Sequence, residues 1–165
     1  MRELKMNDGL QEMMINGDPN RVLRWNPTDT DFGKRYLSLM EYVEGLKGTL
    51  DTISAQLDEI NQNVDVASER GLLTQVTDAL AELGVELSKK IDETFNAPVC
   101  DVVFCGANPM SPTVDGGFLF NNFLEAMSPI VASTVEKAGK TVSKKIAQYA
   151  DAVKKAEMRR SGTKR

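Results

Sequence analysis

The sequence contains no histidine among its 165 residues. Histidine is the commonest general acid or base and a frequent ligand of transition metals, so its absence removes the usual route to either chemistry. The chain also lacks GxSxG, P-loop, GxGxxG and HExxH motifs, and it has no compact carboxylate pair in an apolar context. We therefore expect a protein that is not an enzyme, with no catalytic residues, no metal and no cofactor.

Cysteine is scarce, because Cys100 and Cys105 are the only two. Their CxxxxC spacing matches no common zinc or redox motif. On one helix the two side chains would lie about 140° apart, so they would not share a face. We expect small buried thiols and no disulfide.

Long hydrophobic runs are missing as well. No run of 18 apolar residues occurs, so no membrane-spanning helix and no membrane partner are expected. The first twelve residues, MRELKMNDGLQE, lack the apolar segment of a secretory signal, so the expected location is the cytoplasm. With 41% apolar and 27% charged residues, the composition is typical of a folded globular chain.

The strongest pattern that is present is an apolar stripe with spacings that alternate between four and three. Its members are Phe32, Tyr36, Leu39, Val43, Leu46, Leu50, Ile53, Leu57, Ile60 and Val64. This heptad pattern predicts a long helix over about 29–64, entered through a capping-box-like pair, Thr28 and Asp31. The stripe requires a long partner helix, in the same chain or in another copy. Gly45 and Gly48 interrupt it, which indicates a bend or a close helix crossing.

A second helix is expected over about 72–95. Its stripe consists of Leu72, Val76, Leu80, Leu83, Leu87, Ile91 and Phe95. The polar residues 61–71 are interpreted as a loop or a frayed helix end. Because this connection is short, the two helices should be antiparallel.

The segment before the first helix, residues 1–28, is predicted to form a short β-hairpin or an extended arm. Asn16-Gly17 between two apolar runs is a hairpin turn signal, because both positions favour positive φ. Pro19 follows closely, so the second strand is expected to begin after it.

The rest of the chain predicts a short helix, a loop and a last helix. Val99, Val102, Val103 and Phe104 suit the short helix, and a Gly- and Pro-rich loop follows to residue 117. Asp115 is expected to cap the last helix, whose later part should project from the body. The expected fold is therefore mainly all-α. Long antiparallel helices form a bundle or coiled-coil-like core over 29–156, followed by a disordered basic tail over 157–165.

Aromatic residues and methionine provide the candidate partner-binding residues. Four of the six phenylalanines lie between Phe104 and Phe123. The cluster is either core or an exposed docking surface, and Trp25 either packs on a helix or anchors an interface. The candidates for partner binding are Trp25, Phe104, Met110, Phe118, Phe120 and Phe123.

Charge is unevenly distributed. Residues 137–165 hold ten basic and two acidic residues, a net charge of +8, whereas the whole chain carries −4 and the remainder therefore −12. Such an end can bind an acidic partner or nucleic acid, or it can be a solvated helix end that suits the helix dipole. The candidate electrostatic residues are Lys144, Lys145, Lys154, Lys155, Arg159 and Arg160.

The stretch 95–131, FNAPVCDVVFCGANPMSPTVDGGFLFNNFLEAMSPIV, resembles small helical proteins of the tail-morphogenesis region of phages and prophages of Gram-positive bacteria. The opening ING with WNPTDTDF is also similar to them, although Asn96-Ala97-Pro98 replaces their usual Gly-rich turn and the basic tail is long. The family looks like the tail assembly chaperones. The resemblance implies a non-catalytic protein whose partners are the tape-measure protein and tail-tube subunits.

Two other functions stay open beside the chaperone hypothesis. One is a structural virion component or scaffold, for which a homo-oligomer is possible. The other is a nucleic-acid-associated protein that uses the basic end. Tyr149 is the only aromatic residue of that end, so base stacking has little support and nucleic acid is the less favoured partner.

Overall fold

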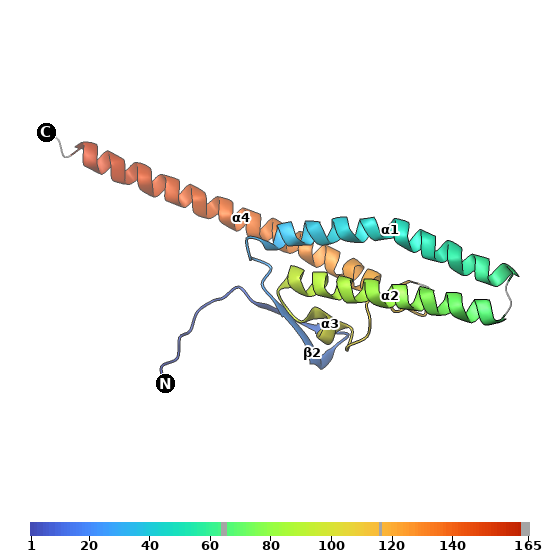
Figure 1. Cartoon of the computed structure of the whole chain (residues 1–165). Coiled ribbons are helices and arrows are strands. Elements are labelled where there is room, and N and C mark those ends of the chain that lie inside the picture. The colour runs from blue at the N-terminus through green and yellow to red at the C-terminus, as the bar shows by residue number, and fades with distance from the viewer. Residues whose placement is uncertain (64–65, 116, 163–165) are drawn as a thin grey trace.

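A computed structural model describes residues 1–63, 66–115 and 117–162. Within these ranges the side chains of residues 57, 59–63, 66–69, 149, 152–154 and 156–162 are not described. The described chain is mainly helical and has a short antiparallel hairpin near its N-terminus (Figure 1). The elements are β1 (Gln11–Ile15), β2 (Asp18–Trp25), α1 (Phe32–Asn63), α2 (Val66–Phe95), α3 (Val99–Val103) and α4 (Leu119–Gly162).

The predicted hairpin is confirmed, with Asn16 (φ 52°) and Gly17 (φ 74°) at its turn. Both angles are positive, as a tight type I′ turn requires. The expectation that the second strand begins after Pro19 is wrong, because β2 begins at Asp18 and includes this proline. The pairing register shifts between Met14 and Ile15, so Pro19 lies in an irregular stretch where a missing N–H is tolerated.

Helices α1 and α2 lie side by side and antiparallel, as the short connection predicted (Figure 1). The heptad stripe faces inward, and its most buried members are Phe32, Leu39, Leu46 and Ile53. Leu57, Ile60 and Val64 lie outside the described side chains. The sequence indicates a loop or a frayed helix end over residues 61–71, but 61–63 belong to α1 and 66–71 to α2.

The entrance to α1 differs from the capping box that the sequence suggested. The side-chain hydroxyl of Thr28 donates to Asn26 Oδ1, whereas Asp29 Oδ1 accepts the backbone N–H of Asp31 at 3.1 Å. The Asp29 carboxylate also accepts Arg35 Nη2 at 2.7 Å, and this hydrogen bond lowers the pKa of Asp29 from its ordinary value. Asp29 therefore organises the start of α1, because its short side chain reaches the backbone N–H two residues later and the Arg35 side chain.

One feature expected at the glycines of α1, a close helix crossing, does not occur. A Cβ on Gly45 or Gly48 would meet nothing within 4 Å, so no helix crosses closely there. Both positions are exposed and helical. They lie on the outer surface, where the sequence pattern alone could not place them.

The predicted short helix is confirmed as α3, and a Gly- and Pro-rich loop leads from it to α4. Asp115 is not the cap of α4, which begins four residues later. Its carboxylate instead accepts the hydroxyl of Thr113 within the loop. Helix α4 continues through Pro129 to Gly162, so residues 157–162 are helical where a disordered tail was expected. Residues 163–165 lie outside the described residues.

The core lies at the open end of the α1–α2 pair, where β2, α3 and the first third of α4 meet it. Trp25, Phe32, Phe95 and Phe120 are among the largest fully buried side chains there. Because Trp25 belongs to the hairpin, the segment 1–28 contributes to this core. Its strands pack on the helical domain that the sequence placed after residue 29.

Candidate binding groove

The aromatic residues predicted to bind partners are mostly core. Trp25 is 1% exposed, and Phe104, Met110, Phe120 and Phe123 are likewise buried. Phe118 is half-buried and stacks on Phe120 with ring centroids 6.0 Å apart. Of the two alternatives left open by the sequence, core or exposed docking surface, the structure places these residues in the core.

A network of ring contacts explains this burial. The Trp25 ring lies 4.7 Å from Phe32 and 5.3 Å from Phe95, and Phe95 lies 5.6 Å from Phe123. Phe123 in turn meets Phe104 edge-on at 5.7 Å. Tilted and edge-on pairs at these centroid distances are favourable beyond the area that they bury. The cluster thus joins the hairpin, both long helices, the short helix and α4.

The two thiols differ in environment. Cys100 is buried, and burial raises the pKa of its thiol to about 12. Its Sγ lies 3.6 Å from the carbonyl oxygen of Ser88. Cys105 is exposed, contrary to the expectation of two buried thiols, and neither cysteine is in a disulfide. Over the residues that the structure describes, no group of three His, Cys, Asp or Glu side chains could hold a metal ion.

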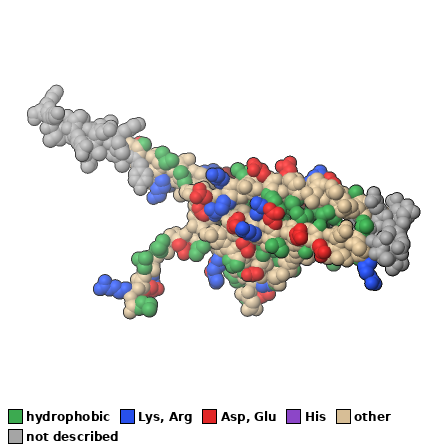
Figure 2. Space-filling model, viewed as in Figure 1, with side chains coloured by type: hydrophobic (Ala, Val, Ile, Leu, Met, Phe, Trp, Pro, Cys, Tyr) green, Lys and Arg blue, Asp and Glu red, His purple; other side chains and the backbone are tan. Residues whose placement is uncertain are grey.

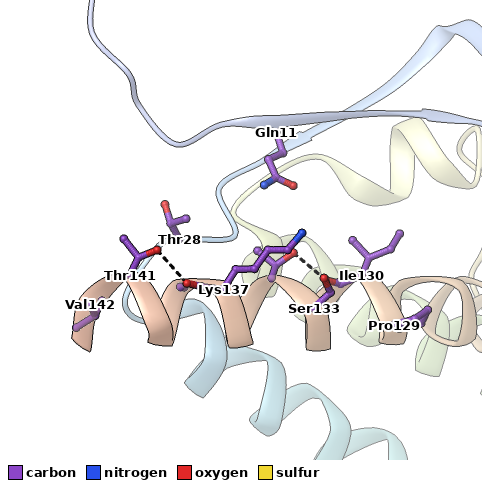
Figure 3. A pocket seen from close by; sticks show the side chains of 10 residues that line it. Gln11, Thr28, Pro129, Ile130, Ser133, Lys137, Thr141 and Val142 are labelled. Carbon is purple, nitrogen blue, oxygen red and sulfur yellow. Dashed lines mark hydrogen bonds between the residues drawn. The ribbon is translucent and has the colours of Figure 1, made fainter. Parts of the chain in front are cut away.

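The surface has a hollow of about 590 Å³ between β1 and α4 (Figure 3). Gln11 points from the strand toward the face of α4 that carries Ser133 and Lys137. Thr28, from the segment that enters α1, closes the same side. The remaining lining comes from α4 between Pro129 and Val142. We call this the outer hollow.

A second hollow of about 500 Å³ continues along α4 toward its N-terminal end. Four consecutive residues, Met13 to Asn16, line one wall, and Val103 and Phe104 line its end. Arg21 of β2 also contributes, and helix α4 supplies the rest: Leu119, Asn122, Phe123, Ala126, Met127 and Ile130. We call this the inner hollow. Ile130 lines both hollows, and we refer to the two together as the β1–α4 groove.

Two hydroxyl groups on the α4 side of this groove are bonded to carbonyls of their own helix. Thr134 Oγ1 donates to the carbonyl of Ile130 at 2.7 Å, and Thr141 Oγ1 donates to the carbonyl of Lys137 at 3.0 Å (Figure 3). A threonine hydroxyl bonded back to its own helix needs no partner from a bound chain. The groove can therefore accept a largely apolar surface.

Charge in the groove is of one sign. Among the residues that line its two hollows, only Arg21 and Lys137 are charged. Arg21 Nε donates to the carbonyl of Val102 at 3.2 Å, and its Nη2 donates to that of Val103, so this side chain also holds α3 to the hairpin. Lys137 is exposed and forms no ion pair among the described side chains.

The predicted electrostatic residues are separate from the core. Lys144, Lys145 and Lys155 are exposed on the projecting part of α4, whereas Lys154, Arg159 and Arg160 lie outside the described side chains. In Figure 2, acidic and basic side chains are interspersed over the visible face of the body, with hydrophobic side chains between them.

Sequence reasoning missed the groove itself. Its α4 wall repeats at three and four residues, a pattern already interpreted as core, and the opposite wall comes from a strand more than 100 residues earlier. The available signal was the composition of α4 after Met127, where Ser, Thr and Ala alternate with few large apolar residues.

No helix within the described ranges is both long and apolar enough to cross a membrane. The chain matches no protein-family model, no curated protein and no solved structure.

Proposed function

We propose that this chain is a non-catalytic binding protein of phage tail assembly, similar to the tail assembly chaperones. The observation that carries the proposal is the β1–α4 groove. It is rimmed by exposed apolar side chains, Met14 at 62% and Ile130 at 36%. Exposed apolar surface in a groove is typical of a site that a partner covers.

The tape-measure protein and tail-tube subunits are the partners that we propose. The resemblance of residues 95–131 to tail-module proteins supports this choice, and so does the lack of charged residues other than Arg21 and Lys137 in the groove lining. A chaperone needs to cover apolar segments of a client before that client assembles. An open groove of this kind serves that purpose without any reaction.

Co-expression with tape-measure and tail-tube fragments tests the proposal. We expect the wild-type chain to retain one fragment and to increase in solution mass by that fragment. Ile130→Asp should abolish retention, because it puts a charge at the junction of the two hollows. Val85→Asp is the matched control, since Val85 is an exposed apolar residue of α2 outside the groove. Failure to retain any fragment, or equal retention by both variants, would refute the proposal.

A nucleic-acid role is the second candidate, and the exposed Lys144, Lys145 and Lys155 favour it. Lysines alone would neutralise phosphates of the nucleic-acid backbone, so binding would depend strongly on salt concentration. Gel shifts at low salt with and without residues 143–165 test this role. Binding that survives the deletion would rule it out.

Self-association through a bundle or coiled coil is the structural alternative. Val135, Val142 and Ile146 are exposed along α4 with a helical repeat, so a second helix could cover them. Light scattering over a range of concentrations separates a closed oligomer from open growth. A constant monomer mass would remove this alternative.

A further inference from the structure

Two regions of the chain carry large charges of opposite sign. Residues 48–86, which belong to α1 and α2 on either side of their connection, contain eight acidic residues and one basic residue, a net charge of −7. We call this region the distal helix pair. Residues 137–165, most of which form the projecting part of α4, carry +8. Figure 1 shows the connection of α1 to α2 and the far end of α4 at opposite ends of the molecule, so the two regions of one chain do not meet.

The charged side chains of both regions lie at the surface. Five acidic residues of the distal helix pair are exposed: Asp51, Asp58, Asp78, Glu82 and Glu86. Lys144, Lys145 and Lys155 are exposed on α4. Among the described side chains, neither group forms an ion pair. Both surfaces are therefore available to a partner of opposite charge.

The distal helix pair leaves apolar surface uncovered. Figure 1 shows α1 and α2 running on toward their connection past the other described elements. The large apolar side chains buried there, Ile53 and Val76, are separate from the main core cluster. Leu80 is half-buried, and Leu73, seven residues earlier on the same face, is 54% exposed. Two helices bury only the stripes that face each other, so this face is open to a third helix.

The projecting part of α4 presents an apolar stripe. Val135, Val142 and Ile146 lie within about 40° of one another around the helix, and Ile146 is 63% exposed. Val135 and Ile146 line neither hollow of the β1–α4 groove, so the stripe is a surface distinct from it. The stripe is about 16 Å long, and residues 66–86 of α2 extend over about 30 Å, so the stripe fits along the distal helix pair.

The charges select between the possible contacts. Pairing of two projecting helices would bring together two segments of +8, and pairing of two distal helix pairs would bring together two regions of −7. Like charges placed together are unfavourable, whereas a projecting helix on a distal helix pair joins opposite charges. A nucleic acid would neutralise the lysines of α4 but would leave the apolar stripe uncovered.

We infer that the projecting part of α4 docks on the distal helix pair of a second copy of this chain and completes a three-helix bundle there. The contact is head-to-tail, so every docked chain keeps one free surface of each kind. Assembly then gives a ring if the rotation between copies closes and a filament if it does not. Docking depends on concentration, so in dilute solution the projecting part stays free. The inference goes beyond the proposed binding of tail proteins and does not depend on it.

Light scattering of the full-length chain over a range of concentrations and salt provides the first test. We expect the mass to rise above that of the monomer as concentration increases at low salt. It should fall back toward the monomer at about 1 M salt, where the Debye length is only about 3 Å. A monomer mass at every concentration, or growth that is independent of salt, would overturn the inference.

Two variants test the head-to-tail geometry. Lys144→Glu combined with Lys145→Glu reverses charge on α4, and Leu73→Asp puts a charge on the open face of the distal helix pair. Each variant should stay monomeric by itself. An equal mixture should form a 1:1 dimer that does not grow, because the intact α4 of one variant docks on the intact helix pair of the other.

Matched controls exclude general effects of charge. Arg2→Glu combined with Lys5→Glu changes the net charge equally in the N-terminal segment, and Leu37→Asp charges an exposed apolar residue near the start of α1. Both should assemble like the wild type. Circular dichroism establishes that the variants are folded before they are mixed. Assembly of Leu73→Asp by itself would indicate pairing of two α4 helices, and this result or a mixture that stays monomeric would overturn the inference.

Discussion

Trp25 connects the hairpin to the helices, but it also buries a polar group, which lowers the stability of the fold. Its ring contacts Phe32 and Phe95, but its Nε1 is buried without a hydrogen-bond partner among the described residues. A buried donor that stays unpaired costs about 1–3 kcal/mol. Packing of the ring must outweigh that cost for the hairpin to stay in place.

Substitution of Trp25 should separate these two effects. Trp25→Ala should lower the free energy of unfolding by about 3–5 kcal/mol, because it leaves a cavity between the rings. Trp25→Phe should cost less than about 2 kcal/mol, since it keeps a ring and removes the unpaired N–H. Urea unfolding measures the free energy of unfolding of both variants. A larger decrease for Trp25→Phe than for Trp25→Ala would contradict this account.

The two cysteines should differ in reactivity for a related reason. Because burial raises the pKa of Cys100 to about 12, its thiolate is scarce at pH 8, and alkylation requires the thiolate. We expect iodoacetamide to modify the exposed Cys105 and to spare Cys100 in the native chain, with both modified in urea. Mass spectrometry of Cys105→Ser provides the control, which should gain no native adduct.

At the scale of elements, one helical glycine is a packing site. Gly84 is buried in α2, and a Cβ there would overlap the side chain of Asn108 from the loop before α4. Asn108 Nδ2 donates to the carbonyl of Ala81 at 3.2 Å, and its Oδ1 accepts the N–H of Met110 at 2.8 Å. This asparagine therefore attaches the loop to α2 only because position 84 has no side chain.

Alanine substitutions at two helical glycines should change the free energy of unfolding in opposite directions. Gly84→Ala should destabilise by about 1–3 kcal/mol, because Asn108 must move. Gly45→Ala, where a Cβ meets nothing within 4 Å, should stabilise by about 0.5–1 kcal/mol through helix propensity. Chemical denaturation of both variants checks the difference, and stabilisation by both would refute the role of Asn108.

For the whole molecule, α4 serves two roles along its length. Up to Val131 it contributes core residues, including Phe120, Phe123 and Met127. From residue 132 to 148 only Thr134 and Ala138 are even half-buried, and Figure 1 shows this part leaving the body. Tertiary stability should therefore depend on the first part alone.

A truncation should reveal this division. We expect removal of residues 143–165 to reduce helical ellipticity and to leave the thermal midpoint unchanged, because the side chains described there are exposed. Met127→Ala, in the buried part, should instead cost about 2–5 kcal/mol. Circular dichroism melts of both proteins check the comparison. A lowered midpoint in the truncated chain would show that the projecting part packs on another surface.

The sequence by itself determined the helical class, the antiparallel helix pair and the tight hairpin turn. These features depend on local rules: the heptad from Phe32, the short connection and the positive φ of Asn16 and Gly17. Helix ends were less predictable. Thr28 and Asp115 are suitable capping residues by type. Their side chains instead form hydrogen bonds with the neighbouring side chains of Asn26 and Thr113.

Only the tertiary structure decided what is buried and what is open. An aromatic residue suits a core and an interface equally, so Trp25 and Phe123 could not be placed until distant elements met around them. The β1–α4 groove joins a strand and a helix more than 100 residues apart, and no local pattern encodes that distance.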